Sequence, residues 1–206
     1  SSILIGTINI TITGTNDAPT VSAATQSVQL VEAGGVANAT PGTASATIAL
    51  TKGDVDGTVS YDATYLRAND WSTSDTGVTY TKVGTYGTAT LTVGTGVVSY
   101  ALDNNKTATQ ALTGGQSTND TFTVRVVDDK GATASVNAVF AITGTNDEPT
   151  VSAATQSVQL VEAGGVANAT PGTASATIAL TKGDVDGTVS YDATYLRAND
   201  WSTRSE

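Results

Sequence analysis

The sequence repeats the stretch Ile142-Thr-Gly-Thr-Asn146-Asp147-Glu-Pro149-Thr-Val151: a near copy, Ile12-Thr-Gly-Thr-Asn16-Asp17-Ala-Pro19-Thr-Val21, lies 130 positions earlier (142 against 12). The residues after it confirm this period, because Pro19–Thr73 returns unchanged as Pro149–Thr203. Such internal identity marks a tandem array. The sequence therefore predicts three parts: the last strand and linker of a preceding repeat (1–18), one complete repeat (19–148) and the truncated beginning of the next repeat (149–206).

The repeated stretch has the composition of a junction between two β domains. Gly14 permits a sharp change of direction, Asn16 and Asp17 favour turns, and Pro19 withholds an N–H from any sheet. The amide and carboxylate oxygens of Asn16 and Asp17 are also ligands that Ca²⁺ accepts. A plain Asx turn with solvated side chains is the alternative interpretation of this pair.

Composition limits the partners of the chain. Acidic residues outnumber basic ones by 19 to 9, which gives a net charge of −10. This charge argues against nucleic acid and anionic membranes as partners and suits a protein that gathers divalent cations. No run is long enough for a transmembrane helix, so we expect no membrane insertion, and any export signal or anchor should lie outside this fragment.

The sequence predicts no enzyme. It has no His and no Cys for acid–base or nucleophilic chemistry, and neither a nucleophile elbow nor a phosphate-binding loop occurs in it. The absence of Cys also indicates a scaffold stabilised by packing or by metal instead of disulfides.

Hydrophobic alternation predicts an all-β chain. Phe122, Val124 and Val126 alternate with polar residues, as do the isoleucines from Ile8 to Ile12, and glycines separate the segments. Many short strands with closely spaced turns are typical of an antiparallel β-sandwich. No α-helix is expected beyond a short helical turn within 67–75. The expected strands are 3–13, 27–31, 44–50, 59–66, 78–83, 88–93, 97–102, 121–127 and 132–142.

An up-and-down order of these strands predicts an acidic cluster at each end of the repeat. One end gathers the linker with the turns after the second strand and between the last two strands. The opposite end gathers the break after the first strand, the 103–105 turn, the next linker and the next copy's turn. So much like charge is unfavourable unless a cation neutralises it, and Ca²⁺ meets that need. The predicted metal ligands are Asn16, Asp17, Asp54, Asp56, Asp128 and Asp129 at the first end, and Glu32, Asp103, Asn146, Asp147, Asp184 and Asp186 at the second.

Several segments together resemble the VCBS repeat found in the extender regions of bacterial RTX adhesins. They are Tyr86–Val93, Tyr100–Asn104, Phe122–Gly131 and the closing Ile142–Pro149, and the strand-end Asp motifs are similar to the calcium junctions of cadherins. The resemblance implies an Ig-like or cadherin-like β-sandwich in tandem repeats, exported to the bacterial cell surface. It also implies a calcium-rigidified spacer that projects a distal ligand-binding domain, with neighbouring repeats as its partners.

The chain departs from this family at two points. The Gly-rich nonapeptides of RTX proteins are absent, and the last turn reads Asp128-Asp129-Lys130-Gly131 where the family often has a single Asp before Gly-Asn-Gly. Which of Asp128 and Asp129 binds metal therefore stays open.

A carbohydrate-binding module is the alternative function, because β-sandwiches often bind sugars through exposed aromatic rings. Trp71, Tyr61 and Tyr65 are the candidates. The competing interpretation places Tyr61 and Tyr65 on a strand face that shares the core and Trp71 over a sandwich edge.

The truncated repeat needs further strands, because its own three would leave an open edge. We expect it to be completed by residues 1–13 or by strand exchange with another molecule. A self-contained domain there would instead favour a permuted unit spanning 74–203.

Overall fold

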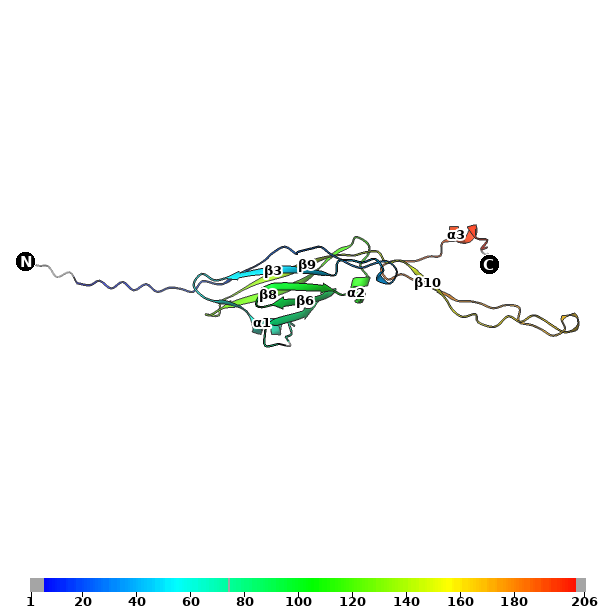
Figure 1. Cartoon of the computed structure of the whole chain (residues 1–206), viewed down its shortest axis with the longest axis horizontal. Coiled ribbons are helices and arrows are strands. Elements are labelled where there is room, and N and C mark those ends of the chain that lie inside the picture. Colours follow the sequence, from blue (N-terminus) through cyan, green and yellow to red (C-terminus); the bar gives the residue numbers. More distant parts are fainter. Residues whose placement is uncertain (1–5, 74, 203–206) are drawn as a thin grey trace, which may run out of the picture.

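The computed structural model describes residues 6–73 and 75–202, and it consists mostly of β-strands in antiparallel sheets with a few short helices (Figure 1). The all-β class expected from the sequence is therefore confirmed. The strands are β1 (Thr20–Ala23), β2 (Leu30–Val31), β3 (Ser45–Gly53), β4 (Val59–Tyr61), β5 (Thr79–Val83), β6 (Gly87–Thr92), β7 (Val97–Leu102), β8 (Ser117–Asp128), β9 (Thr133–Thr143), β10 (Thr150–Ala153) and β11 (Leu180–Gly183). The helices are α1 (Ala63–Ala68), α2 (Thr107–Gln110) and α3 (Ala193–Ala198), with single 3-10 turns η1 (Val36–Asn38) and η2 (Val166–Asn168).

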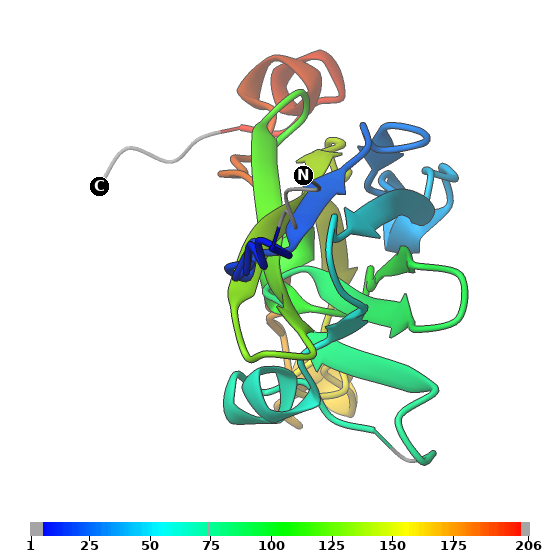
Figure 2. The ribbon, with the colours of Figure 1, turned by 90° about the vertical axis from the view of Figure 1, so that its left-hand side faces the viewer.

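Strands β1 to β9 build two sheets, seen end-on in Figure 2. One sheet has the order β1-β3-β7-β6-β5 and the other the order β2-β9-β8-β4, with β10 and β11 paired separately. Neighbours are antiparallel except β2 and β9, which are parallel. The up-and-down order was wrong, because the chain changes sheets at each step from β1 to β4.

Aromatic and branched side chains from both sheets form one core. Tyr100 of β7 stacks on Phe140 of β9 with ring centroids 4.8 Å apart, and Phe122 of β8 meets Trp71 edge-on at 6.0 Å. Every second residue of β8 from Asp120 to Asp128 is buried, which agrees with the predicted alternation of Phe122, Val124 and Val126. The long strands β8 and β9 run between the two ends of the domain: the turn after Asp128 lies at one end, and the linker that follows Thr143 lies at the other.

The first strand lies earlier than expected. Thr20–Ala23 pairs with β3, and only Leu30 and Val31 of the expected strand 27–31 pair with β9. The intervening residues still follow β3, since Ala24 and Ser27 donate backbone hydrogen bonds to Ala49 and Thr47 at 2.8 and 2.9 Å, but they then cross to the other sheet.

The expected strand 59–66 was wrong beyond Tyr61, because α1 begins at Ala63. The Asp62 carboxylate accepts the backbone N–H of Tyr65 at 2.9 Å and caps the helix. Helices α1 and α2 also correct the expectation of no helix, although both are short.

The two ends of the chain lie outside the two sheets. Residues 6–13 are extended and exposed and pair with no strand of the described residues, so the described part of the expected strand 3–13 is wrong and residues 3–5 lie outside the description. They leave one end of the domain while residues 150–202 leave the other, so residues 6–13 do not complete the second copy (Figure 1). The second copy is not self-contained either, because most of its apolar side chains are exposed.

Candidate metal sites at the two ends of the domain

The first linker contacts two acidic turns that are far from it in sequence. Asn16 Nδ2 donates to Asp128 Oδ2 at 2.8 Å, and the backbone N–H of Asp17 donates to Asp56 Oδ2 at 3.2 Å. Asp128 ends β8 and Asp56 lies in the turn after β3, so the two sheets bring both turns to this end. The predicted gathering of these groups is therefore observed, although it follows from a different strand order.

The neighbouring carboxylates Asp128 and Asp129 have different surroundings. The hydrogen bond from Asn16 and those from the backbone N–H groups of Lys130 and Ala132 hold the pKa of Asp128 below its usual range. Asp129 is held below its usual pKa mainly by its ion pair with Lys130, and its Oδ1 also accepts the Thr58 N–H at 3.3 Å. Asp128 is thus the carboxylate that reaches the linker.

The second linker repeats this arrangement with the next copy. The backbone N–H of Asp147 donates to Asp186 Oδ2 at 3.2 Å, the counterpart of the contact between Asp17 and Asp56. Asn146 Nδ2 donates to its neighbour's carbonyl at 2.6 Å, as Asn16 Nδ2 does at 2.7 Å. Residues 184–187 of the second copy therefore return to the linker that precedes them.

Glu32 is buried against this second linker. Its side chain accepts the Thr145 backbone N–H at 3.1 Å and Gln110 Nε2 at 3.3 Å. Burial raises its pKa to about 7, and the nearby charges of Asp147 and Asp186 add to that rise. A buried carboxyl thus belongs to the same site as two residues more than a hundred positions later.

Glycine at position 34 allows this close approach. A Cβ there would lie 2.8 Å from the Asn146 carbonyl oxygen, and Gly35 donates its N–H to that same oxygen at 3.1 Å. Glu32-Ala-Gly-Gly35, which was expected to interrupt a strand and to place Glu32 near the next linker, is therefore the surface that contacts that linker.

The 103–105 turn takes part through a different residue from the one predicted. Asn104 Oδ1 accepts the Ala33 N–H at 3.1 Å, next to Glu32. The Asp103 carboxylate accepts the Asn105 N–H at 2.9 Å, and within the described residues it has no hydrogen bond to Glu32 or to the linker. Asp103 therefore stabilises its own turn.

Several acidic oxygens at these two ends are buried without a hydrogen bond in the described residues. They are Asp54 Oδ2 at the first end and Asp147 Oδ2, Asp184 Oδ1 and Asp186 Oδ1 at the second. Burial of the second cluster raises the pKa of Asp147, and the charges of Asp186 and Asp184 add to that rise. An unpaired buried carboxylate is unfavourable, and an oxygen-binding cation would satisfy it.

The donor set is therefore of the type that Ca²⁺ takes. Within residues 6–73 and 75–202, however, no three acidic side chains converge closely enough to form a metal-binding group.

The three aromatic candidates for sugar binding are mostly covered. Trp71 is 1% exposed and Tyr61 7% exposed, so neither ring offers a free face. Tyr65 lies on α1 instead of a strand, with the Arg125 guanidinium 4.2 Å from its ring centroid. In the assembled copy, none of these three rings forms a flat exposed platform.

Sequence reasoning did not find Asp120, a buried carboxylate with three donors. It accepts the backbone N–H groups of Thr85 and Tyr86 at 3.1 and 3.0 Å and the Tyr100 hydroxyl at 2.6 Å. The only signal was a charged residue at an inward-facing position of a strand. Asp120 fastens the turn between β5 and β6 to β8.

Comparison with protein-family models finds no match to this sequence, and neither does comparison with curated proteins. No helix of the described residues is long and apolar enough to cross a membrane.

Proposed function

We propose that residues 19–148 form one Ig-like or cadherin-like β-sandwich repeat of a calcium-rigidified extender in a large bacterial surface adhesin. Residues 1–18 and 149–206 belong to neighbouring repeats in this proposal. The array projects a distal ligand-binding domain from the cell, and each repeat has its sequence neighbours as partners.

The observation that carries this proposal is the equivalence of the two linkers. Each one donates a backbone N–H to the Asp-Val-Asp turn that follows it, Asp17 to Asp56 and Asp147 to Asp186. At the second linker the preceding repeat also contributes, through Glu32. Groups from two successive copies thus meet at one linker.

A cation at this junction would change the stiffness of the array. Glu32, Asn146 and Asp147 of one copy with Asp184 and Asp186 of the next would supply oxygens to Ca²⁺ at the second linker. Asn16, Asp17, Asp54, Asp56 and Asp128 would do so at the first linker. Ion binding removes the repulsion between carboxylates that point toward the same linker. The linker then has one preferred direction, whereas without the ion it behaves as a flexible connection.

Calorimetric titration of the whole chain with Ca²⁺ tests this function. We expect Asp184→Asn/Asp186→Asn to remove binding at the second linker and Asp54→Asn/Asp56→Asn to remove binding at the first. Asp70→Asn is the control, because Asp70 is exposed and its positive φ of 64° suits Asn. Absence of a binding heat, or equal binding by all variants, would contradict the proposal.

A further inference from the structure

Residues 149–202 carry the same sequence as the first half of the domain but expose the side chains that are core there. Leu30 is 0% exposed and its counterpart Leu160 53%; Ile48 is 2% exposed and Ile178 54%. Trp71 and Trp201 differ in the same way, with 1% and 66%. An apolar face of this extent needs a partner.

The surface that fits this face is present once in the chain, in residues 75–148. In the first copy β3 pairs with β7 and β4 with β8. Asp62 forms a salt bridge of 2.7 Å with Arg125, and Trp71 Nε1 donates to the Thr123 carbonyl at 3.3 Å. Each of these contacts has an identical donor or acceptor in the second copy.

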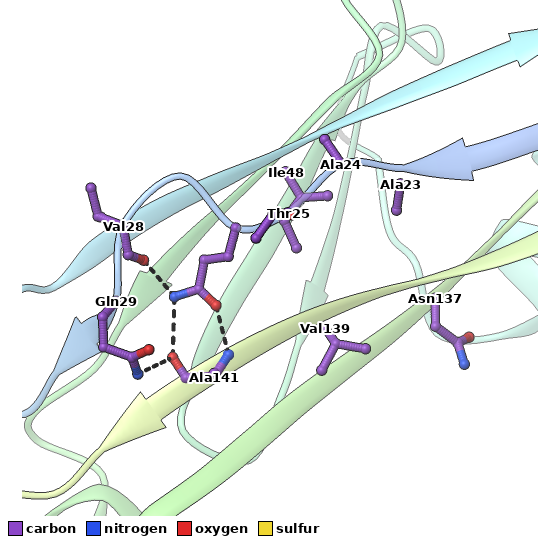
Figure 3. A pocket seen from close by; sticks show the side chains of 10 residues that line it. Ala23, Ala24, Thr25, Val28, Gln29, Ile48, Asn137, Val139 and Ala141 are labelled. Atoms are coloured by element: carbon purple, nitrogen blue, oxygen red, sulfur yellow. Dashed lines mark hydrogen bonds between the residues drawn. The ribbon is translucent and has the colours of Figure 1, made fainter.

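The groove in Figure 3 shows another part of the same interface, where residues 23–29 face β9. Gln26 closes this edge like a strand residue: its Oε1 accepts the Ala141 N–H at 2.7 Å and its Nε2 donates to the Ala141 carbonyl at 3.1 Å. Among the described residues of the second copy, Gln156 forms only the internal hydrogen bond to the Val158 carbonyl, which corresponds to the bond from Gln26 to Val28.

The second copy already has much of the local structure that docking requires. β10 pairs with β11 in the register of β1 with β3, so that Val151 lies opposite Lys182 as Val21 does opposite Lys52. Asp192 caps α3 as Asp62 caps α1. These elements exist before docking, whereas residues 175–179, 160–161 and 189–191 have to take up the strand pairing of β3, β2 and β4.

The same molecule cannot use its second copy to replace its first. Thr143 ends β9 beside Val31, whereas the position to be filled by Thr150 is that of Thr20, at the opposite end where Asp17 meets Asp56. β9 has 11 residues and so spans about 33 Å. The connection from Thr143 to Thr150 reaches at most about 25 Å when fully extended.

We propose that residues 149–202 of one molecule dock on residues 75–148 of a second copy of this chain, in place of that copy's residues 19–73. Reciprocal exchange gives a closed two-fold dimer in which each hybrid domain has the contacts of the original. Residues 19–73 are covalently linked to residues 75–148 of the same molecule, and this linkage favours docking within one molecule over exchange. Exchange therefore requires that this half be released, by unfolding or by mutation.

Damage to the first half in the whole chain is the direct test, carried out in EDTA so that calcium plays no part. Ile48→Asp should prevent the first half from docking, and Ile178→Asp is the matched change in the second. Trp71→Phe in every variant leaves Trp201 as the single fluorescent reporter. We expect Ile48→Asp to give a folded dimer by light scattering, with Trp201 emission shifted to the blue.

The controls decide between the alternatives. Ile178→Asp should remain a folded monomer with exposed Trp201, and the double variant should not fold. A folded monomer of Ile48→Asp with buried Trp201 would mean docking within one molecule and would overturn the proposal. An unfolded Ile48→Asp, indistinguishable from the double variant at every concentration, would overturn it as well.

Refolding of the Trp71→Phe chain without other changes gives a second, independent measurement. Dimer with blue-shifted Trp201 emission should increase with the protein concentration during refolding. Only monomers with exposed Trp201 at all concentrations would contradict exchange, whatever the solubility of the Ile48→Asp variant.

Discussion

At the scale of single residues, the neighbours of a carboxylate decide its role. Asp128 accepts several N–H donors at the end of β8, whereas Glu32 is buried beside other acids. Asp120 is buried like Glu32, but three donors satisfy it. The sequence indicated which acids lie near turns, since turn residues follow strands that alternate. It could not separate Asp103 from Asn104, because which of two adjacent side chains faces a neighbouring segment depends on the path of the turn.

Glu32 should make stability depend on pH in the absence of metal. Its pKa is about 7 in the folded protein against an ordinary 4.5, so the folded state holds the proton more tightly than the unfolded state. The free energy of unfolding should therefore fall as pH rises from 4.5 to about 7 and level off above. Glu32→Gln should flatten this fall in urea unfolding at a series of pH values in EDTA.

Glu162 is the matched control for this measurement, because it has the same local sequence in the second copy but is exposed. Glu162→Gln should keep the pH dependence of the unchanged chain. If Glu32→Gln showed the same slope as the control, Glu32 would not be the group responsible.

At the scale of elements, the repeated sequence separates local from tertiary causes of structure. The helical turn forms in both copies, as α1 and α3, because its cap is local. β3 runs over nine residues but its counterpart β11 over four. Residues 45–49 of β3 pair with β7, whereas residues 175–179 pair with no strand of the described residues. The strands between 79 and 143 were predictable from alternation, except that β8 begins at Ser117, four residues before the expected start at 121. The end of β4 was not, because Val59–Leu66 alternates like a strand and only the cap at Asp62 begins the helix.

The cap and ion pair of Asp62 should matter only in the assembled copy. Asp62→Ala removes a helix cap and a partly buried partner of Arg125, so it should lower the free energy of unfolding by about 1–3 kcal/mol. Asp192→Ala removes the same cap from α3, which is exposed, and should leave the main unfolding transition unchanged. Denaturant unfolding followed by circular dichroism measures both. Equal destabilisation by the two variants would show that α3 is packed like α1.

At the scale of the whole molecule, the domain is built so that its acids lie at its two ends. The chain carries a net charge of −10, and both linkers leave from ends that hold buried carboxylate oxygens without a hydrogen bond in the described residues. The positions of the turns in the sequence predicted this distribution of acidic residues, although they did not predict the strand order. In the proposed function, an ion joins each linker to the turn after it.

Calorimetric unfolding of the whole chain in excess Ca²⁺ and in excess EDTA tests this claim most directly. An ion that binds only the folded state at a hundred times its Kd stabilises it by about 2.7 kcal/mol, which corresponds to a rise in Tm of roughly 5–10 °C. We expect that rise in the unchanged chain and a smaller one in Asp54→Asn/Asp56→Asn. Superimposable transitions in Ca²⁺ and EDTA would contradict the account.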